Sequence, residues 1–210
     1  MSGWEIIGTV LGVIGVWLMI RQNIWGWPVG LVQVAVYAWV FFDTRLYSDA
    51  ILQIFFFAIQ AYGWWHWRKG KGRRATSPAP NPRSEVAAPP AGGQEERGTL
   101  PVTRLSLRAM AASIVIGAGL TAAWGAFMHR STDAALPWWD AFILVFSLIA
   151  QWLQARKNLE CWAGWIIVNT VAIGVYWAKD LRLTSGLYLI FWVMALWGWR
   201  EWRQSMKGTA

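Results

Sequence analysis

The sequence of 210 residues has few of the groups that support soluble or thiol chemistry. It contains one cysteine, Cys161, which excludes an internal disulfide and a metal site built from several thiolates. Charged residues make up 14% of the chain, whereas soluble domains have about 25%, and hydrophobic residues make up 56%. The two histidines, His66 and His129, are expected at helix ends in solvated or structural roles. This composition indicates an integral membrane protein.

Recognisable catalytic motifs are also missing from the sequence. We find no credible Ser-His-Asp set, no paired carboxylates at one depth, no HExxH segment and no phosphate-binding loop. An intramembrane enzyme is therefore the weakest interpretation, and we expect no catalytic site, no metal and no cofactor. The first apolar segment lacks a basic amino-terminal region and a cleavage site, so we interpret it as a spanning helix and not as a secretory signal.

What the sequence does contain is an internal repeat with an offset of 135 residues. Trp27 recurs as Trp162, and the segment GWWHW at 63–67 recurs as GWREW at 198–202. Further matched pairs are Trp4/Trp139, Glu5/Asp140, Trp17/Trp152, Arg21/Arg156 and Asn23/Asn158. Small apolar chains built from two similar halves are typical of transporters, which bind their substrate between the halves. Transport is therefore the leading functional interpretation.

Apolar runs of spanning length predict an all-α integral membrane protein with seven transmembrane helices. The helices are expected near residues 4–20, 26–42, 48–67, 105–128, 138–155, 162–178 and 184–202. Three helices reverse the direction of the chain, so two copies can run parallel only if one extra helix lies between them. We therefore expect two parallel three-helix repeats joined by a linker helix, which is a 3+1+3 arrangement.

Four segments follow from this arrangement. They are a first three-helix repeat at 1–67, a cytoplasmic disordered loop at 68–104, a linker transmembrane helix at 105–128 and a second three-helix repeat at 129–210. The loop combines the basic run RKGKGRR with a tract rich in Pro, Ala and Gly, and such a composition buries too little apolar surface to fold.

The distribution of Lys and Arg predicts the membrane topology. If the amino terminus lies outside, fifteen of the 19 basic residues fall on the inner side, many of them in and around the loop. We therefore expect a multi-pass protein with its amino terminus outside and its carboxyl terminus in the cytoplasm. The net charge of +8 is then explained by topology and by anionic lipid of the bilayer, and no nucleic-acid partner is expected.

Amide and aromatic side chains share helix faces in both halves of the chain. The members of each pair are four or seven residues apart, which places them on one face of a helix. Such faces suit a flat, hydrogen-bonding solute, because rings stack on planar or cationic groups and amides both donate and accept. The alternative, weighted equally for each amide, is a hydrogen bond that only joins two helices. The predicted substrate-binding residues are Gln33, Tyr37, Gln53, Gln60, Trp165, Asn169, Tyr188 and Trp192.

Four segments together resemble the PnuC-type vitamin transporters of bacteria. They are NIWGWPVG, DTRLYSDAILQIFFFAIQAYGWWHW, the W-x-x-x-N formed by Trp165 and Asn169, and GLYLIFWVMALWGW. The resemblance covers roughly residues 4–67 and 105–203. It implies a 3+1+3 plan similar to that of the SWEET sugar transporters, an inner-membrane location, and a site of aromatic and amide side chains between two bundles.

The resemblance also implies a function, which is the uptake of nicotinamide riboside by facilitated diffusion with alternating access. In that family a cytoplasmic kinase phosphorylates the substrate and so traps it. On matched positions the resemblance assigns substrate contact to six of the residues above, whereas Gln33 and Tyr37 depend on helical spacing alone. Relatives of this build are thought to carry thiamine or riboflavin, so another vitamin is the first alternative. A non-transporting membrane receptor or scaffold is the second alternative, and the resemblance also allows a homo-oligomer.

Overall fold

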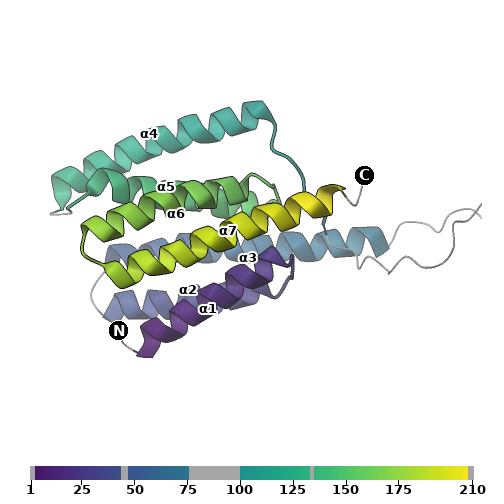
Figure 1. Cartoon of the computed structure of the whole chain (residues 1–210), viewed down its shortest axis with the longest axis horizontal. Coiled ribbons are helices and arrows are strands. Elements are labelled where there is room, and N and C mark those ends of the chain that lie inside the picture. The colour runs from purple at the N-terminus through teal and green to yellow at the C-terminus, as the bar shows by residue number, and fades with distance from the viewer. Residues whose placement is uncertain (1–2, 44–46, 76–99, 133–134, 208–210) are drawn as a thin grey trace, which may run out of the picture.

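The computed structural model describes residues 3–43, 47–75, 100–132 and 135–207, and this part of the chain is helical, without named strands. The helices are α1 (Gly3–Ile20), α2 (Gly26–Asp43), α3 (Tyr47–Ala75), α4 (Leu107–Ser131), α5 (Pro137–Ala155), α6 (Cys161–Ala178) and α7 (Arg182–Lys207). They form an elongated bundle in which α1 begins at one end and α7 finishes at the other (Figure 1). We call these the N-terminal end and the C-terminal end of the bundle. The prediction of seven helices is confirmed for the described residues.

Within the described residues, three helices are long and apolar enough to cross a membrane, namely α4, α5 and α6. Large apolar side chains of α4, such as Val115, Ile116 and Leu120, are exposed. In a soluble protein this surface would be unfavourable, whereas in a bilayer it faces hydrocarbon. The exposed apolar surface therefore agrees with the membrane class predicted from composition.

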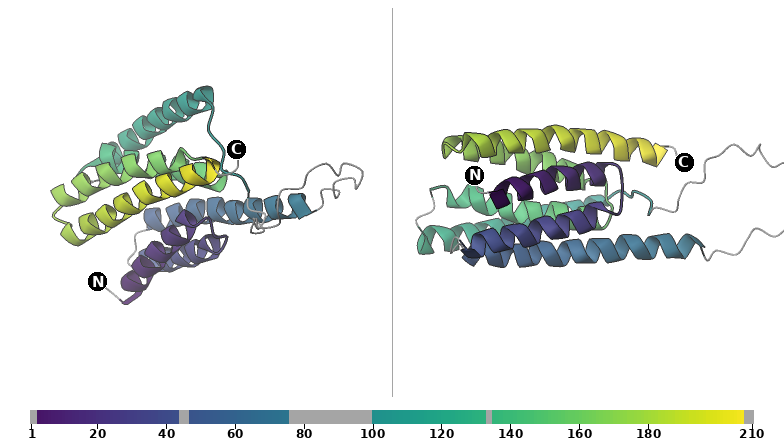
Figure 2. Two further views of the ribbon diagram at one scale, coloured as in Figure 1. Left: turned by 45° about the vertical axis from the view of Figure 1, so that its right-hand side comes forward. Right: turned by 90° about the horizontal axis from the view of Figure 1, so that it is seen from below.

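The helices pack in two groups. In the first helix group α1 packs on α2 and α2 on α3, and in the second helix group α5 packs on α6 and α6 on α7. The groups meet where α3 contacts α5 and α1 contacts α7, while α4 packs on α5. Figure 2 shows that α1 and α2 diverge from the second group toward the N-terminal end.

Four buried tryptophans hold the two groups together at the C-terminal end. Trp27 and Trp67 meet edge to face with ring centroids 5.4 Å apart, and Trp162 and Trp202 do the same at 5.4 Å. Trp67 Nε1 donates a hydrogen bond to the backbone oxygen of Ala155 at 3.1 Å, from the first group to the second. Trp202 Nε1 donates to the backbone oxygen of Met19 at 3.1 Å, from the second group to the first. We call these two hydrogen bonds the indole latch.

Two glycines make this close packing possible. A Cβ atom on Gly63 would lie 2.4 Å from the ring of Trp27, and one on Gly198 would lie 2.6 Å from the ring of Trp162. Both distances are shorter than real carbon contacts, so only glycine lets α3 and α7 approach these rings. The repeat noted in the sequence thus corresponds to the same local packing in both groups.

Helix α3 is longer than predicted, because it continues to Ala75 whereas the loop was expected from residue 68. Lys69 Nζ lies 3.9 Å from the ring centroid of Trp65, and the Arg68 guanidinium lies 5.6 Å from that of Trp64. Each cation follows its ring by four residues, so these contacts form only in a helix and stabilise the extension. The boundary predicted at residue 67 was wrong, and the disorder predicted for the central part of the loop lies outside the described residues.

The segment 100–106, assigned in part to the predicted loop, packs against the turn between α5 and α6. Thr103 N donates to the backbone oxygen of Lys157 at 3.0 Å, and Lys157 Nζ donates to the backbone oxygen of Leu100. The side chain of Leu100 in turn lies against Gly70 of α3. The segment therefore bridges α3 and the second helix group at the C-terminal end of the bundle.

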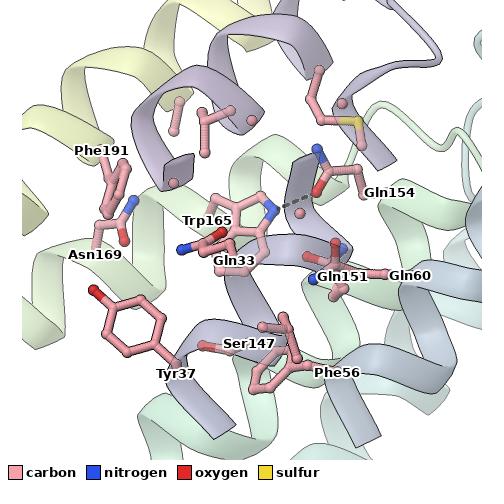
Figure 3. Close-up of a pocket in the computed structure, with 18 of the residues that line it drawn as sticks. Gln33, Tyr37, Phe56, Gln60, Ser147, Gln151, Gln154, Trp165, Asn169 and Phe191 are labelled. Atoms are coloured by element: carbon pink, nitrogen blue, oxygen red, sulfur yellow. Dashed lines mark hydrogen bonds between the residues drawn. The ribbon is translucent and has the colours of Figure 1, made fainter. Parts of the chain in front are cut away.

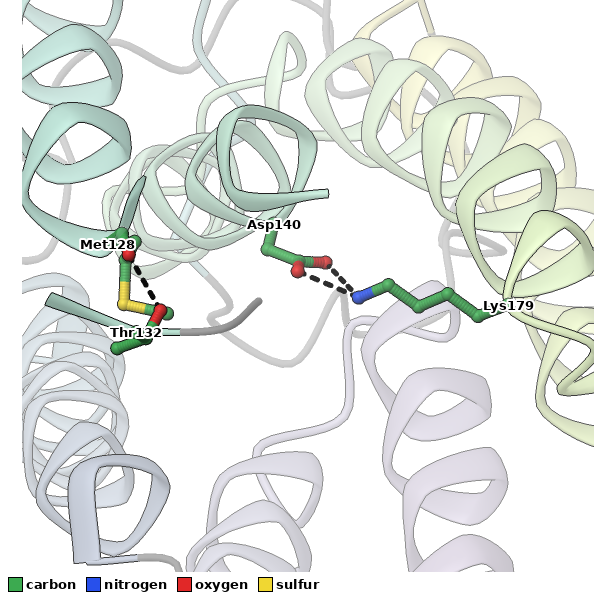
Figure 4. Close-up of polar contacts among 4 residues, drawn as sticks. All are labelled: Met128, Thr132, Asp140 and Lys179. Carbon is green, nitrogen blue, oxygen red and sulfur yellow. Dashed lines mark hydrogen bonds and ion pairs between the residues drawn. The ribbon is translucent and has the colours of Figure 1, made fainter. Parts of the chain in front are cut away.

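At the N-terminal end, an ion pair joins the start of α5 to the end of α6. Lys179 Nζ lies 2.7 Å from each carboxylate oxygen of Asp140 (Figure 4). The same view shows the end of α4, where Thr132 Oγ1 donates to the backbone oxygen of Met128 at 2.7 Å. Both contacts fix the ends of neighbouring helices without crossing between the two helix groups.

Candidate binding site

A cavity of about 300 Å³ lies between the two helix groups. Residues of α1, α2, α3, α5, α6 and α7 line it, and α4 contributes none of its described residues. Figure 3 shows amide, hydroxyl and aromatic side chains directed into this space from several helices. The polar and aromatic lining residues are Gln33, Tyr37, Gln53, Phe56, Gln60, Ser147, Gln151, Gln154, Trp162, Trp165, Asn169, Tyr188 and Phe191.

The structure brings seven of the eight predicted residues to this cavity and leaves Trp192 outside it. The indole of Trp192 points to α6, where its Nε1 donates to Thr170 Oγ1 at 3.0 Å. Phe191 lines the cavity instead, three residues after Tyr188. Positions three and four residues apart lie on opposite flanks of one helix face, and the four-residue spacing selected the wrong flank of α7.

Helix α5 contributes a polar stripe that the sequence analysis did not include. Ser147, Gln151 and Gln154 are spaced by four and three residues, so they share one face, and all three line the cavity. This spacing in an otherwise apolar helix was a usable signal in the sequence. It was missed because the search for polar faces was confined to the second and third helices of each half.

Hydrogen bonding separates the amides into two kinds. Gln154 Oε1 accepts a hydrogen bond from Trp165 Nε1 at 3.1 Å, so this amide joins α5 to α6 (Figure 3). The side chains of Gln60 and Asn169 are 7% and 4% exposed, and within the described part of the chain neither forms a hydrogen bond with protein. Both residues line the cavity, so their amide groups are available there to water or to a bound solute.

Close contacts position the remaining polar side chains. The side-chain oxygen of Gln60 occupies the space beside Gly30, where a Cβ would lie 2.0 Å away. The hydroxyl of Tyr37 lies 3.3 Å from Thr9 Oγ1 in the first helix group. In the second group the ring of Tyr188 stacks on Tyr176 with centroids 5.0 Å apart. Packing within each group thus holds these side chains at the cavity wall.

Most cavity positions occur in pairs separated by the repeat offset of 135 residues. The cavity therefore lies where equivalent faces of the two helix groups meet. The pairs in which both members line it are Gly12/Ser147, Val16/Gln151, Met19/Gln154, Gly30/Trp165, Val34/Asn169, Gln53/Tyr188, Phe56/Phe191 and Gln60/Ala195.

The chemistry of the lining suits a small solute without a strong negative charge. None of the described lining residues is Lys, Arg, His, Asp or Glu. In the described part of the chain no three His, Cys, Asp or Glu side chains gather in a way that fits a metal ion. Rings offer stacking or cation–π contacts and the free amides offer paired donors and acceptors. The site therefore fits a flat, polar molecule of modest size.

Comparison with known proteins also indicates a transporter of small molecules. The family model described as nicotinamide mononucleotide transporter matches residues 2–204. The chain is 28% identical to the nicotinamide riboside transporter PnuC of Escherichia coli (strain K12), covering 99% of this chain and 87% of that protein. It is also 28% identical to the riboflavin/roseoflavin transporter RibM of Streptomyces davaonensis, covering 94% of this chain and 83% of that protein.

A solved structure described as the crystal structure of the vitamin B3 transporter PnuC has a similar fold. The two structures superpose with a TM-score of 0.70 at 23% sequence identity, covering 97% of this chain and 82% of the other. Together with the family match over nearly the whole chain, this agreement leads to one conclusion: the chain belongs to the nicotinamide mononucleotide transporter family of membrane proteins.

Proposed function

We propose that this protein takes up nicotinamide riboside across a bacterial inner membrane by facilitated diffusion. The observation that carries the proposal is the cavity between the helix groups, in which Gln60 and Asn169 are buried without protein partners beside the ring of Trp165. The pyridinium ring of the riboside would stack on Trp165, its carboxamide would bond an amide, and its ribose hydroxyls would bond the others. The site residues are those predicted from the sequence, with Phe191 in place of Trp192.

The lining of the cavity favours the riboside over its phosphorylated form. A phosphate carries a charge near minus two at neutral pH, and burial of such a charge requires a cation or several strong donors. The described lining residues include no Lys, Arg or His, so no cation there offsets the charge, and neutral amides are weaker donors to a dianion. The same property supports trapping, because a substrate phosphorylated in the cytoplasm would no longer fit the site.

The contacts between the helix groups support alternating access as part of the proposal. The indole latch, the hydrogen bond from Gln22 Nε2 to Ser205 Oγ (2.9 Å) and the contact of Arg21 with Glu201 (3.8 Å) all join the two groups at the C-terminal end. We interpret this as a conformation closed at the C-terminal end, with the groups spread toward the N-terminal end. Rocking of one group against the other would open the latch and expose the cavity on the opposite side.

The 3+1+3 arrangement and the orientation belong to the same proposal. Equivalent turn hydrogen bonds support the repeat: Asn23 N donates to Leu18 O and Asn158 N donates to Leu153 O, both at 2.9 Å. Helix α4 packs on α5, as expected for a linker between two parallel repeats. Basic residues concentrate at the C-terminal end of the bundle, which supports a cytoplasmic position for that end and for the carboxyl terminus.

Riboflavin is the second candidate substrate, because RibM is as similar in sequence as the riboside transporter of Escherichia coli. The size of the cavity argues against it. A volume of about 300 Å³ is at the small end of ligand sites, which suits the single ring of the riboside better than three fused rings.

The test is transport by purified protein in liposomes, with nicotinamide riboside, nicotinamide mononucleotide, riboflavin and thiamine compared at equal concentration. We expect rapid equilibration of the riboside without an ion gradient and no uptake of the mononucleotide above empty liposomes. Equal rates for riboside and mononucleotide would refute the argument from the uncharged lining. Uptake of riboflavin or thiamine alone would keep the mechanism and change the substrate. Absence of any transport by folded protein would favour the receptor interpretation.

A further inference from the structure

The repeat-related faces that meet at the cavity have different chemistry. On α1 the lining positions are Gly12, Gly15, Val16 and Met19, and the counterparts of Gly12, Val16 and Met19 on α5 carry a hydroxyl and two amides. The α1 face of the cavity is thus apolar and the α5 face is polar, although both faces occupy equivalent places in the repeat. A ligand between them meets different chemistry at the α1 face and at the α5 face, so its two possible orientations are not equivalent.

The two halves also differ in which of the paired cavity positions carries the larger side chain. In the first half Gly30 is small and Gln60 fills the space beside it, with the amide oxygen against the glycine. In the second half the counterparts are reversed, because Trp165 is large and Ala195 is small. One half therefore presents an amide and the other an indole at equivalent places in the cavity.

Gln154 connects these two differences. The residue is 5% exposed, and its Oε1 accepts a hydrogen bond from Trp165 Nε1 at 3.1 Å. Its backbone is held as well, because Gln154 O accepts a hydrogen bond from Lys157 N at 3.0 Å in the turn that ends α5. The counterpart of Gln154 in the first half is Met19, which has no strong acceptor in its side chain and has no indole to hold.

We propose that Gln154 is a positioning residue for substrate recognition, which fixes the ring of Trp165 so that its face, and not its N–H edge, meets the aromatic ring of the ligand. This inference rests on the proposed function, because it assumes a ligand with a planar ring. With the indole N–H bonded to Gln154, rotation of Trp165 would break a buried hydrogen bond, so the stacking surface is in place before the ligand arrives. The polar groups of the ligand are then directed to Gln151 and Ser147 on the same α5 face.

A double-mutant cycle tests the positioning role. The variants are Gln154→Met, which introduces the residue of the repeat counterpart at similar volume, Trp165→Phe, which keeps a ring but has no N–H, and the combination of both. We expect Gln154→Met to weaken binding of nicotinamide riboside about tenfold in isothermal titration. We expect little further loss when it is added to Trp165→Phe. Gln154→Glu, which retains an acceptor, should recover most of the affinity.

An equal loss from Gln154→Met in both backgrounds would overturn the inference, because Gln154 would then act without Trp165. A second measurement needs no ligand. In protein labelled with ¹⁵N-tryptophan, the indole N–H resonance removed by Trp165→Phe should move in Gln154→Met, and a resonance that stays in place would overturn the contact itself. If wild-type protein binds riboflavin and not the riboside, the cycle is run with riboflavin. Protein that binds neither refutes the proposed function, while the resonance still decides whether Gln154 holds Trp165.

Discussion

The geometry of the indole latch allows us to predict how much the loss of one N–H donor changes the population that is open at the C-terminal end. Trp67→Phe and Trp202→Phe each keep an aromatic ring in the cluster and remove only the N–H that bonds to the opposite helix group. Both changes should favour opening at the C-terminal end, because the latch bonds exist only while the two groups are together. The proposed mechanism requires this opening in every transport cycle.

The structure indicates that the two variants have unequal effects. Met19 O accepts a second hydrogen bond, from Gln22 N at 3.0 Å, so it keeps a donor in Trp202→Phe. The donor that the structure shows for Ala155 O is the indole of Trp67, and its loss leaves a buried carbonyl. A hydrogen bond contributes about 1 kcal/mol net, and a buried acceptor left unsatisfied costs about 1–3 kcal/mol. We therefore expect the open population to rise about fivefold for Trp202→Phe and about tenfold or more for Trp67→Phe.

The single cysteine of the chain provides the assay. Cys161 is fully buried in the cluster that contains Trp67 and Trp202, so a small thiol reagent reaches it only when that cluster opens. If opening and closing are fast, the labelling rate is proportional to the open population. Trp4→Phe is the matched control, because Trp4 is 55% exposed in α1 near the other end.

Three outcomes of the labelling experiment distinguish gating by the indoles from stabilisation of the fold alone. Labelling that rises in the order Trp202→Phe, Trp67→Phe and the double variant, with melting temperatures changed little, supports the latch. Labelling that rises only in parallel with global unfolding would show that the indoles stabilise the fold without gating it. Rates equal to those of wild type and Trp4→Phe would refute the reasoning.

Two further predictions concern the contacts around the latch. In a Cys161→Ala background, Gln22→Cys with Ser205→Cys places thiols where side chains are now 2.9 Å apart, so a short reversible bifunctional thiol reagent should stop transport in liposomes and a reductant should restore it. Unchanged transport after complete cross-linking, shown by mass spectrometry, would exclude opening at this end. Gly63→Ala forces a methyl to within 2.4 Å of a tryptophan ring and should destabilise the protein by about 1–3 kcal/mol in thermal unfolding, whereas Gly186→Ala, with open space around its Cα, should leave stability unchanged or slightly higher. Equal melting temperatures for the two glycine variants would contradict the packing argument.

The positions of the helices could be predicted from the sequence because spanning helices are defined by local apolar runs. Predicted and observed helix starts agree within two residues, since each follows a break in apolar character that needs no tertiary information. The end predicted for α3, at residue 67, was wrong because the basic residues that follow it were taken to end the helix. The cations of Arg68 and Lys69 lie over the rings of Trp64 and Trp65, and these contacts stabilise the helix beyond the predicted end.

Other features depend on contacts between distant residues. Nothing in the composition of residues 100–106 indicates that Thr103 pairs with Lys157, because that contact exists only once α5 and α6 are in place. The choice between Phe191 and Trp192 is of the same kind, since the rotation of α7 about its axis is set by its packing on α6. By contrast, the spacing of Ser147 and Gln151 on α5 was visible from the start.

The positions where the two halves agree and differ have a physical explanation. At the C-terminal end the halves carry the same residues, with Trp27 matching Trp162 and Gly63 matching Gly198, because both groups must close by the same ring-on-glycine packing. At the cavity most pairs differ. A ligand with an aromatic ring at one end and a sugar at the other has no twofold symmetry, so a cavity with identical walls would satisfy one end twice and the other not at all. In the proposed site, divergence between equivalent positions therefore points to the α5 face, whose polar residues have apolar counterparts on α1.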